Sequence, residues 1–176
     1  MKKHEVDHVL RAAGRINGEK QFVIIGSQSL HGRHPDLPDR IMLSVEVDLI
    51  ANRHADRTEW LNAIGVYSKF HDSFGYYADP VDENTAVLPR GWKGRLVNLA
   101  PGDTEGVRGL CLDPHDLAIA KYVARRDKDI IFNRELVRRA VLGEAQLLSL
   151  LDKTPVDEQA RQRIRGFIAQ EFAALG

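Results

Sequence analysis

Phe22-Val-Ile-Ile-Gly-Ser-Gln-Ser29 opens the part of the sequence that decides the fold. Four apolar residues stop abruptly at Gly26-Ser27, which predicts a buried strand that turns directly into a helix. Backbone N–H groups and a hydroxyl then lie at the start of that helix, an arrangement that favours anions such as phosphate. Gly26 lets a phosphate approach closely because glycine has no Cβ. A plain strand-to-helix turn gives the same pattern, so this motif alone leaves both interpretations open.

The second decisive segment, Leu43-Ser-Val-Glu-Val-Asp-Leu49, alternates apolar and polar residues. This alternation predicts a half-buried strand with Val45 and the other apolar residues on one face. Glu46 and Asp48 share the opposite face, about 6.5 Å apart along the strand. Two carboxylates at this spacing suit a hard cation such as Mg²⁺. Half-buried strands also carry acids on a wet face without any such role, and that interpretation stays open here.

Composition narrows the class of protein. The 176 residues fit one domain, or a core with a helical appendage. Acidic and basic residues balance at 25 each, so no overall field attracts the chain to nucleic acid or to a membrane. The single cysteine, Cys111, excludes an internal disulfide, and its apolar neighbours predict a buried thiol. The start of the chain lacks the apolar segment of a signal peptide, and we expect a cytoplasmic protein with no membrane partner.

The order of local patterns predicts an α+β fold. Up to residue 112, strand patterns mix with helical ones; from Asp113 onward the pattern is entirely helical, starting with an N-cap aspartate followed by Pro114. We therefore predict an α/β core over residues 1–112 and a C-terminal helical segment over residues 113–176. Strands are expected at 22–25, 41–50, 74–77, 85–88, 95–99 and 107–112. Helices are expected at 5–15, 27–32, 57–66, 114–125, 127–141, 144–151 and 157–175.

Two motifs in this order carry a family resemblance. Gly26-Ser27 after the first strand, and Glu46-Val47-Asp48 on the next, resemble the nucleotidyltransferase superfamily with the polymerase-beta-like fold. Leu117-Ala-Ile-Ala-Lys121, followed by Ala124-Arg-Arg-Asp-Lys-Asp129, is similar to small toxin-type bacterial nucleotidyltransferases, including the abortive-infection kind. The resemblance implies a mixed nucleotidyltransferase-type sheet flanked by helices. It also implies transfer of a nucleoside monophosphate from an NTP to an RNA or protein hydroxyl, with an antitoxin-like protein as partner.

The same resemblance assigns roles to five residues. Glu46 and Asp48 are the expected catalytic residues and the expected ligands of Mg²⁺. Gly26 and Ser27 are expected to bind the outer phosphates of the NTP. Lys121 is expected to reach the triphosphate as a point charge; a solvated helix lysine is the alternative interpretation. The basic residues that follow Lys121 are expected to form a surface, with an RNA acceptor as one candidate partner.

One departure from the family pattern argues against catalytic activity. Active members bring a third carboxylate from a later strand, and the strand expected to match, Arg95–Leu99, offers Asn98 instead. An amide cannot take up a proton as a carboxylate does. Asp79, Asp82 and Asp103 are the candidates to replace the missing carboxylate, although all three are expected in loops. A catalytically degenerate binding or interaction module on the same fold is therefore the alternative function.

Overall fold

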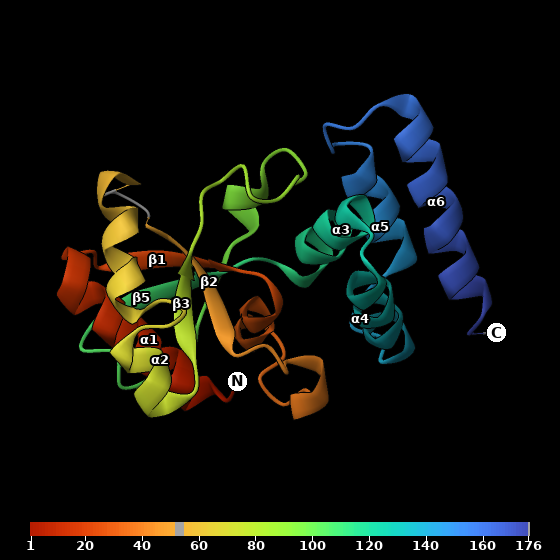
Figure 1. Cartoon of the computed structure of the whole chain (residues 1–176). Helices are drawn as coiled ribbons and strands as arrows, with labels where there is room; N and C mark the ends of the chain where they lie inside the picture. Colours follow the sequence, from red (N-terminus) through yellow and green to blue (C-terminus); the bar gives the residue numbers. More distant parts are fainter. Residues whose placement is uncertain (52–54, 176) are drawn as a thin grey trace. The chain divides into compact units, whose positions relative to one another are not determined.

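A mixed five-stranded sheet forms the centre of the first part of the chain. The computed structural model describes residues 1–51 and 55–175. The strand order is β3-β2-β1-β5-β4, with β1–β2 and β4–β5 antiparallel and β1–β5 and β2–β3 parallel. α1 and α2 lie beside the sheet (Figure 1). The bounds are α1 Lys3–Asn17, β1 Gln21–Ile25, β2 Glu46–Ala51, α2 Lys69–Phe74, β3 Tyr77–Pro80, β4 Val97–Asn98 and β5 Arg108–Cys111.

The chain divides into two compact units. The sheet unit comprises Met1–Thr85 and Leu96–Leu112, and the helical unit comprises Ala86–Arg95 and Asp113–Gly176. The expected α+β class, with helices flanking a mixed sheet and helices following it, is confirmed. None of the helices in the described ranges is both long and apolar enough to cross a membrane.

The core of the sheet unit forms where α1 packs on one face of the sheet. The apolar stripe of α1 has the 3.6-residue period of an amphipathic helix, and its members Val6, Leu10 and Ala13 are fully buried. Val47 and Leu49 of β2 are fully buried in the same cluster. Because side chains alternate along a strand, burial of Val47 and Leu49 leaves Glu46 and Asp48 to the opposite face.

The second strand starts later than the sequence predicts. β2 begins at Glu46, whereas Asp39–Ile41 forms a short 3₁₀ turn, η2. Only the last four residues of β2 pair with β1, because β1 ends at Ile25, which pairs with Asp48. Val45 therefore lies beyond the end of β1 and is 45% exposed, so its predicted place on the buried face is wrong.

The largest error concerns residues 69–80. The predicted strand at 74–77 is wrong, since Ser68 caps a short helix, α2, by accepting a hydrogen bond from the His71 amide at 3.1 Å. Gly75 ends that helix in the left-handed conformation, with φ 76°. The strand β3 starts only at Tyr77.

Two other predicted elements also differ. Residues 55–64 form a 3₁₀ helix, η3, in place of the predicted α-helix. The predicted strand at 85–88 is absent from the described residues.

The helical unit follows the predicted order. Asp113 caps its first helix by accepting a hydrogen bond from the His115 amide at 2.9 Å, as its position before Pro114 predicts. The fully buried Asp116 accepts two hydrogen bonds from Arg95, at 2.7 and 2.8 Å. These bonds attach the segment Ala86–Arg95 to the rest of the helical unit. The bounds are η4 Trp92–Arg95, α3 Pro114–Ala124, α4 Asp127–Arg138, α5 Glu144–Leu151 and α6 Glu158–Ala173.

Candidate active site

The glycine corner and the acidic strand meet at Gly26 and Asp48. Gly26 directly follows β1 and has φ 69° and ψ −168°, a conformation that side chains rarely adopt. Ile25 pairs with Asp48 across the antiparallel β1–β2 ladder. A Cβ atom at position 26 would overlap the Oδ2 atom of Asp48. The Asp48 carboxylate therefore lies directly over the corner, and only glycine leaves room for it.

Ser27 begins the short 3₁₀ helix η1, Ser27–Gly32. The next serine, Ser29, is used internally: its amide and its hydroxyl both donate to the Gly26 carbonyl, at 3.2 and 2.8 Å. Gln28 donates to the carbonyls of Met42 and Ser44 and so fastens the segment that leads into β2. The half-buried Ser27 hydroxyl forms no hydrogen bond with the described residues, which leaves it able to donate to a bound anion.

A third acid, Asp79, lies beside the predicted pair on the strand β3, so its predicted place in a loop is wrong. The parallel register of β2 and β3 places Glu46 next to Tyr77 and Asp48 next to Asp79. Ala78 between them is fully buried, so Tyr77 and Asp79 share the face that carries Glu46 and Asp48. We call these three carboxylates, Glu46, Asp48 and Asp79, the acid face. The alternation Tyr77-Ala78-Asp79 is the one local signal for this face, and it does not predict the pairing of β3 with β2.

The side chains of the acid face influence one another's pKa values. Partial burial, followed by the negative charge of Glu46, raises the pKa of Asp79 above its ordinary value. The pKa of the Tyr77 hydroxyl is also raised, first by burial and then by the charge of Glu46; the charges of Asp79 and Asp48 act in the same direction. Like charges gathered at one place are typical of functional sites, because a bound cation relieves their repulsion.

The other candidates for a third acid lie elsewhere. Asn98 is exposed on β4, at the opposite edge of the sheet from β3, so the prediction that its strand matches the third-acid strand is wrong. Asp103 forms an ion pair with Arg11. The Oδ1 atom of Asp82 accepts a hydrogen bond from the Asn84 amide at 2.7 Å in a turn. Asp79 alone of the four residues stands on the sheet next to Asp48.

The donor set of the acid face suits Mg²⁺. Within the described ranges, no three histidine, cysteine or acidic side chains converge closely enough to form a complete metal cage. Mg²⁺ is usually held by one or two carboxylates together with water and substrate phosphates, so a complete protein cage is not required. Glu46 and Asp48 would supply the hard oxygen ligands, and the carboxylate of Asp48 lies beside the corner where phosphates are expected to bind.

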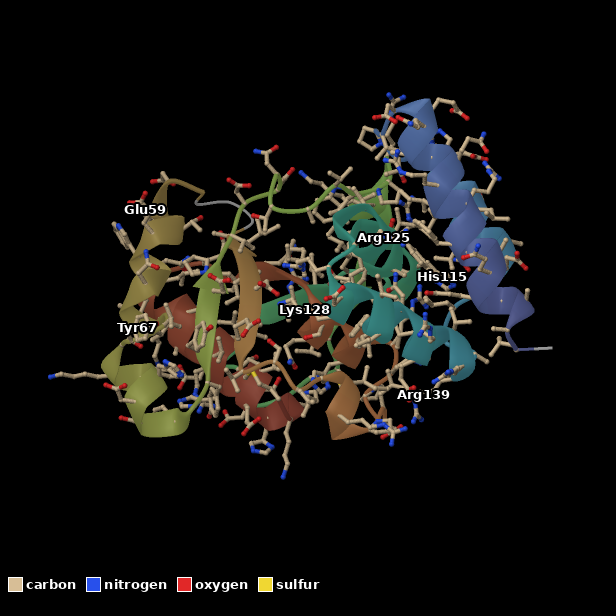
Figure 2. All side chains as sticks on the ribbon, turned by 45° about the vertical axis from the view of Figure 1, so that its right-hand side comes forward. Glu59, Tyr67, His115, Arg125, Lys128 and Arg139 are labelled. Atoms are coloured by element: carbon tan, nitrogen blue, oxygen red, sulfur yellow. The ribbon has the colours of Figure 1, made fainter. Side chains whose placement is uncertain are left out.

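Lys121 belongs to the helical unit, where it forms part of an ion-pair cluster. Its Nζ atom donates to Asp129 at 2.9 Å and lies 4.3 Å from the centre of the Phe132 ring. Asp129 is fully buried and also accepts a hydrogen bond from Arg126 at 2.7 Å. Two cations share one carboxylate, which leaves a net positive charge. The neighbouring Lys128 is exposed, as predicted for this basic stretch (Figure 2).

Comparison with known protein families gives a match over most of the chain. A family model described as a nucleotidyltransferase of unknown function (DUF6036) matches residues 3–166. No curated protein and no solved structure shows significant similarity to the chain. The matched range includes the glycine corner, the acid face and Lys121, so one family pattern extends over both units.

Proposed function

The chain belongs to this family of nucleotidyltransferases, and from that premise we propose that it transfers a nucleoside monophosphate from an NTP to a hydroxyl group of an RNA or a protein, with Mg²⁺ as cofactor. One observation carries the proposal: the acid face lies beside a glycine corner that only glycine fits. Phosphate-binding and cation-binding groups are thus neighbours, as phosphoryl chemistry requires.

The residues divide the chemistry between them. Ser27 and the backbone at Gly26 bind the outer phosphates, and Glu46 and Asp48 hold the cation. Mg²⁺, when bound, would neutralise the charge that develops on the triphosphate. The acceptor oxygen forms a bond to the α-phosphorus, the bond between the α- and β-phosphates breaks, and pyrophosphate leaves. Asp79, whose raised pKa suits a general base, takes the proton of the acceptor hydroxyl.

The biological setting of this activity is also part of the proposal. We propose a toxin of a toxin–antitoxin or phage-defence system, with an antitoxin-like protein as partner. The support is the similarity of residues 117–129 to toxin-type bacterial members of the superfamily, including the abortive-infection kind. Lys121, in this stretch, is proposed to bind the triphosphate, and the net positive charge of its cluster supports that role.

A transfer assay tests the activity. The whole chain is incubated with Mg²⁺, total RNA or a protein extract, and each of the four NTPs labelled at the α-phosphate. Label that becomes attached to RNA or protein supports the proposal. The second candidate function is a degenerate binding module, favoured by the incomplete metal cage among the described residues and by Glu46 in place of the commoner aspartate. That candidate predicts nucleotide binding without transfer for any NTP and any acceptor.

Asp79→Asn is expected to stabilise the protein in the absence of ligands while it lowers the transfer rate. Burial and the charge of Glu46 raise the pKa of Asp79, so the folded state holds the charged carboxylate less favourably than the unfolded chain does. This penalty is absent below the ordinary Asp pKa of about 3.9 and develops as the pH rises through the raised value. Thermal unfolding without Mg²⁺ should therefore show a higher Tm for the variant at pH 7 and a shrinking difference towards pH 4.

The control for this experiment is Asp72→Asn, which changes an exposed carboxylate on α2. We expect little change in either transfer or Tm for it. An Asp79→Asn protein with a lower Tm at pH 7 and an unchanged transfer rate would show that Asp79 serves the structure and not the site.

A further inference from the structure

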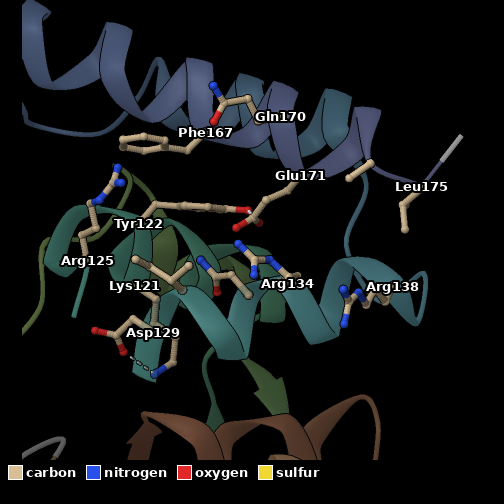
Figure 3. A pocket seen from close by; sticks show the side chains of 13 residues that line it. Lys121, Tyr122, Arg125, Asp129, Arg134, Arg138, Phe167, Gln170, Glu171 and Leu175 are labelled. Carbon is tan, nitrogen blue, oxygen red and sulfur yellow. Dashed lines mark hydrogen bonds and ion pairs between the residues drawn. The ribbon is translucent and has the colours of Figure 1, made fainter. Parts of the chain in front are cut away.

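The helical unit contains a pocket of about 340 Å³ lined by residues of α3, α4 and α6. Figure 3 shows Phe167 and Glu171 pointing from α6 towards Tyr122 on α3 and Arg134 on α4. Apolar surface comes from Phe167, Tyr122 and Ile130. Most of the other lining residues are charged or carry an amide group, so the pocket pairs an apolar wall with polar groups that can orient a ligand.

The charge of the pocket lining is positive. Arg134 and Arg138 are one helical turn apart on α4, about 6 Å along its axis, so both occupy the same side. Both are exposed, and neither forms an ion pair with the described residues. The two acids of the lining are already engaged: Asp129 holds Lys121, and Glu171 accepts a hydrogen bond from the Tyr122 hydroxyl at 2.5 Å. Guanidinium groups in this setting suit a phosphate, which they bind through paired hydrogen bonds.

Two details of the lining point to a ligand with a flat ring. Arg125 adopts the left-handed conformation at the end of α3, with φ 48°, where glycine is favoured. Its guanidinium lies 3.2 Å from the centre of the Phe167 ring, so the strained residue builds a planar stack at the pocket wall. Asn133, also in the lining and fully buried, has an Oδ1 atom without a hydrogen-bond partner among the described residues. A donor on the ligand would satisfy it.

We propose that this pocket binds one nucleotide unit, with its phosphate on Arg134 and Arg138 and its base against the stack of Arg125 and Phe167. The unpartnered acceptor oxygen of Asn133 favours a base over an acyl chain, because a base carries N–H donors and an acyl chain would leave this oxygen unsatisfied. The site lies wholly within the helical unit and does not depend on the acid face. The nucleotide unit that binds there is either a free mononucleotide or one nucleotide within a single-stranded RNA.

The test is fluorescence anisotropy of a labelled single-stranded RNA oligonucleotide with the whole chain, in EDTA so that no Mg²⁺-dependent binding contributes. The double variant Arg134→Gln/Arg138→Gln should weaken binding at least about tenfold and reduce the salt slope by roughly 0.7, for the one phosphate of a single strand that the two arginines bind. Phe167→Leu keeps an apolar side chain but removes the ring, and should weaken RNA binding about tenfold through lost stacking. The salt slope of the Phe167→Leu variant should equal that of the unchanged protein, because its phosphate contacts remain.

The matched control is Arg163→Gln, an exposed arginine of α6 outside the pocket lining. Its affinity should stay within twofold of the unchanged protein. Competition by AMP identifies a free mononucleotide as sufficient, and competition by RNA alone identifies the polymer; each result supports the site. Absence of binding by both probes, or equal losses in Arg163→Gln, would overturn it. If the double glutamine variant does not fold by circular dichroism, Arg→Lys at both positions keeps the charge and should still weaken binding by loss of the paired hydrogen bonds.

Discussion

Asp48→Asn is expected to lower the initial rate of nucleotide transfer by about 100- to 1,000-fold. The change keeps the size of the side chain but removes the negative charge over the Gly26 corner. A cation ligand at this place contributes several kcal/mol of charge stabilisation in the transition state, and each 1.4 kcal/mol corresponds to about tenfold in rate. Initial rates with labelled NTP at saturating Mg²⁺ measure the effect. Glu46→Gln should act in the same direction, because it removes the other predicted ligand.

The control for this prediction is Glu59→Gln, which alters an exposed carboxylate on η3 (Figure 2). It removes the same amount of charge from the sheet unit but lies outside the acid face, so the transfer rate should change less than about twofold. Circular dichroism should show that both variants keep their fold. Transfer by Asp48→Asn within tenfold of the unchanged protein would contradict the assignment of the acid face as the catalytic site.

Local pattern was sufficient for the elements that carry the two motifs. The apolar run that stops at Gly26-Ser27 predicted β1 and the helical turn after it, and both occur with nearly the predicted bounds. The alternation around Val47 predicted a strand with one buried face. Asp113 followed by Pro114 predicted the start of α3 at the observed residue. In each case the information lies within a few neighbouring residues, because capping and alternation are local properties.

Two features of the candidate site were not predictable in this way. Asp79 joins Asp48 only through the pairing of β3 with β2, and the start of β3 depends on the left-handed Gly75 that ends α2. Aromatic residues around Gly75 have high strand propensity, and the local helix overrides it. The charged residues around Asp129 in the sequence predict an exposed side chain. Asp129 is nevertheless fully buried, because Lys121 approaches it from the preceding helix. Both features are tertiary pairings.

The burial of Asp129 leads to the second large prediction: Asp129→Ala is expected to lower the free energy of unfolding by about 3–5 kcal/mol. The change leaves the Lys121 ammonium, which is 14% exposed, without its carboxylate partner. It also removes the acceptor of the Arg126 backbone amide and side chain at the start of α4. Such a loss is a large part of the roughly 5–15 kcal/mol that a domain has in total. Urea unfolding followed by circular dichroism in the far-ultraviolet helix band measures it.

The pH dependence of this effect has a definite sign. Burial acts to raise the pKa of Asp129, but the hydrogen bonds from Arg126 and Lys121 outweigh it and the pKa lies below its ordinary value. A lowered pKa in the folded state means that the charged carboxylate stabilises the protein above the ordinary Asp pKa of about 3.9. The stability difference between the unchanged protein and Asp129→Asn should therefore be constant from pH 7 to pH 5. It should shrink as the pH falls below about 4 and Asp129 becomes protonated.

Asp127→Ala separates this pairing from a general effect of charge at the start of α4. Asp127 is exposed in the first turn of the same helix, where a carboxylate contributes less than about 1 kcal/mol through the helix dipole. Lys121→Met should also cost less than Asp129→Ala, because Arg126 still pairs with the buried carboxylate. Equal losses for Asp127→Ala and Asp129→Ala would contradict the pairing. The effect of Asp129→Ala on the free energy of unfolding can also be measured in the Lys121→Met protein. A smaller loss there than in the unchanged protein gives the energy that couples the two side chains across the turn between α3 and α4.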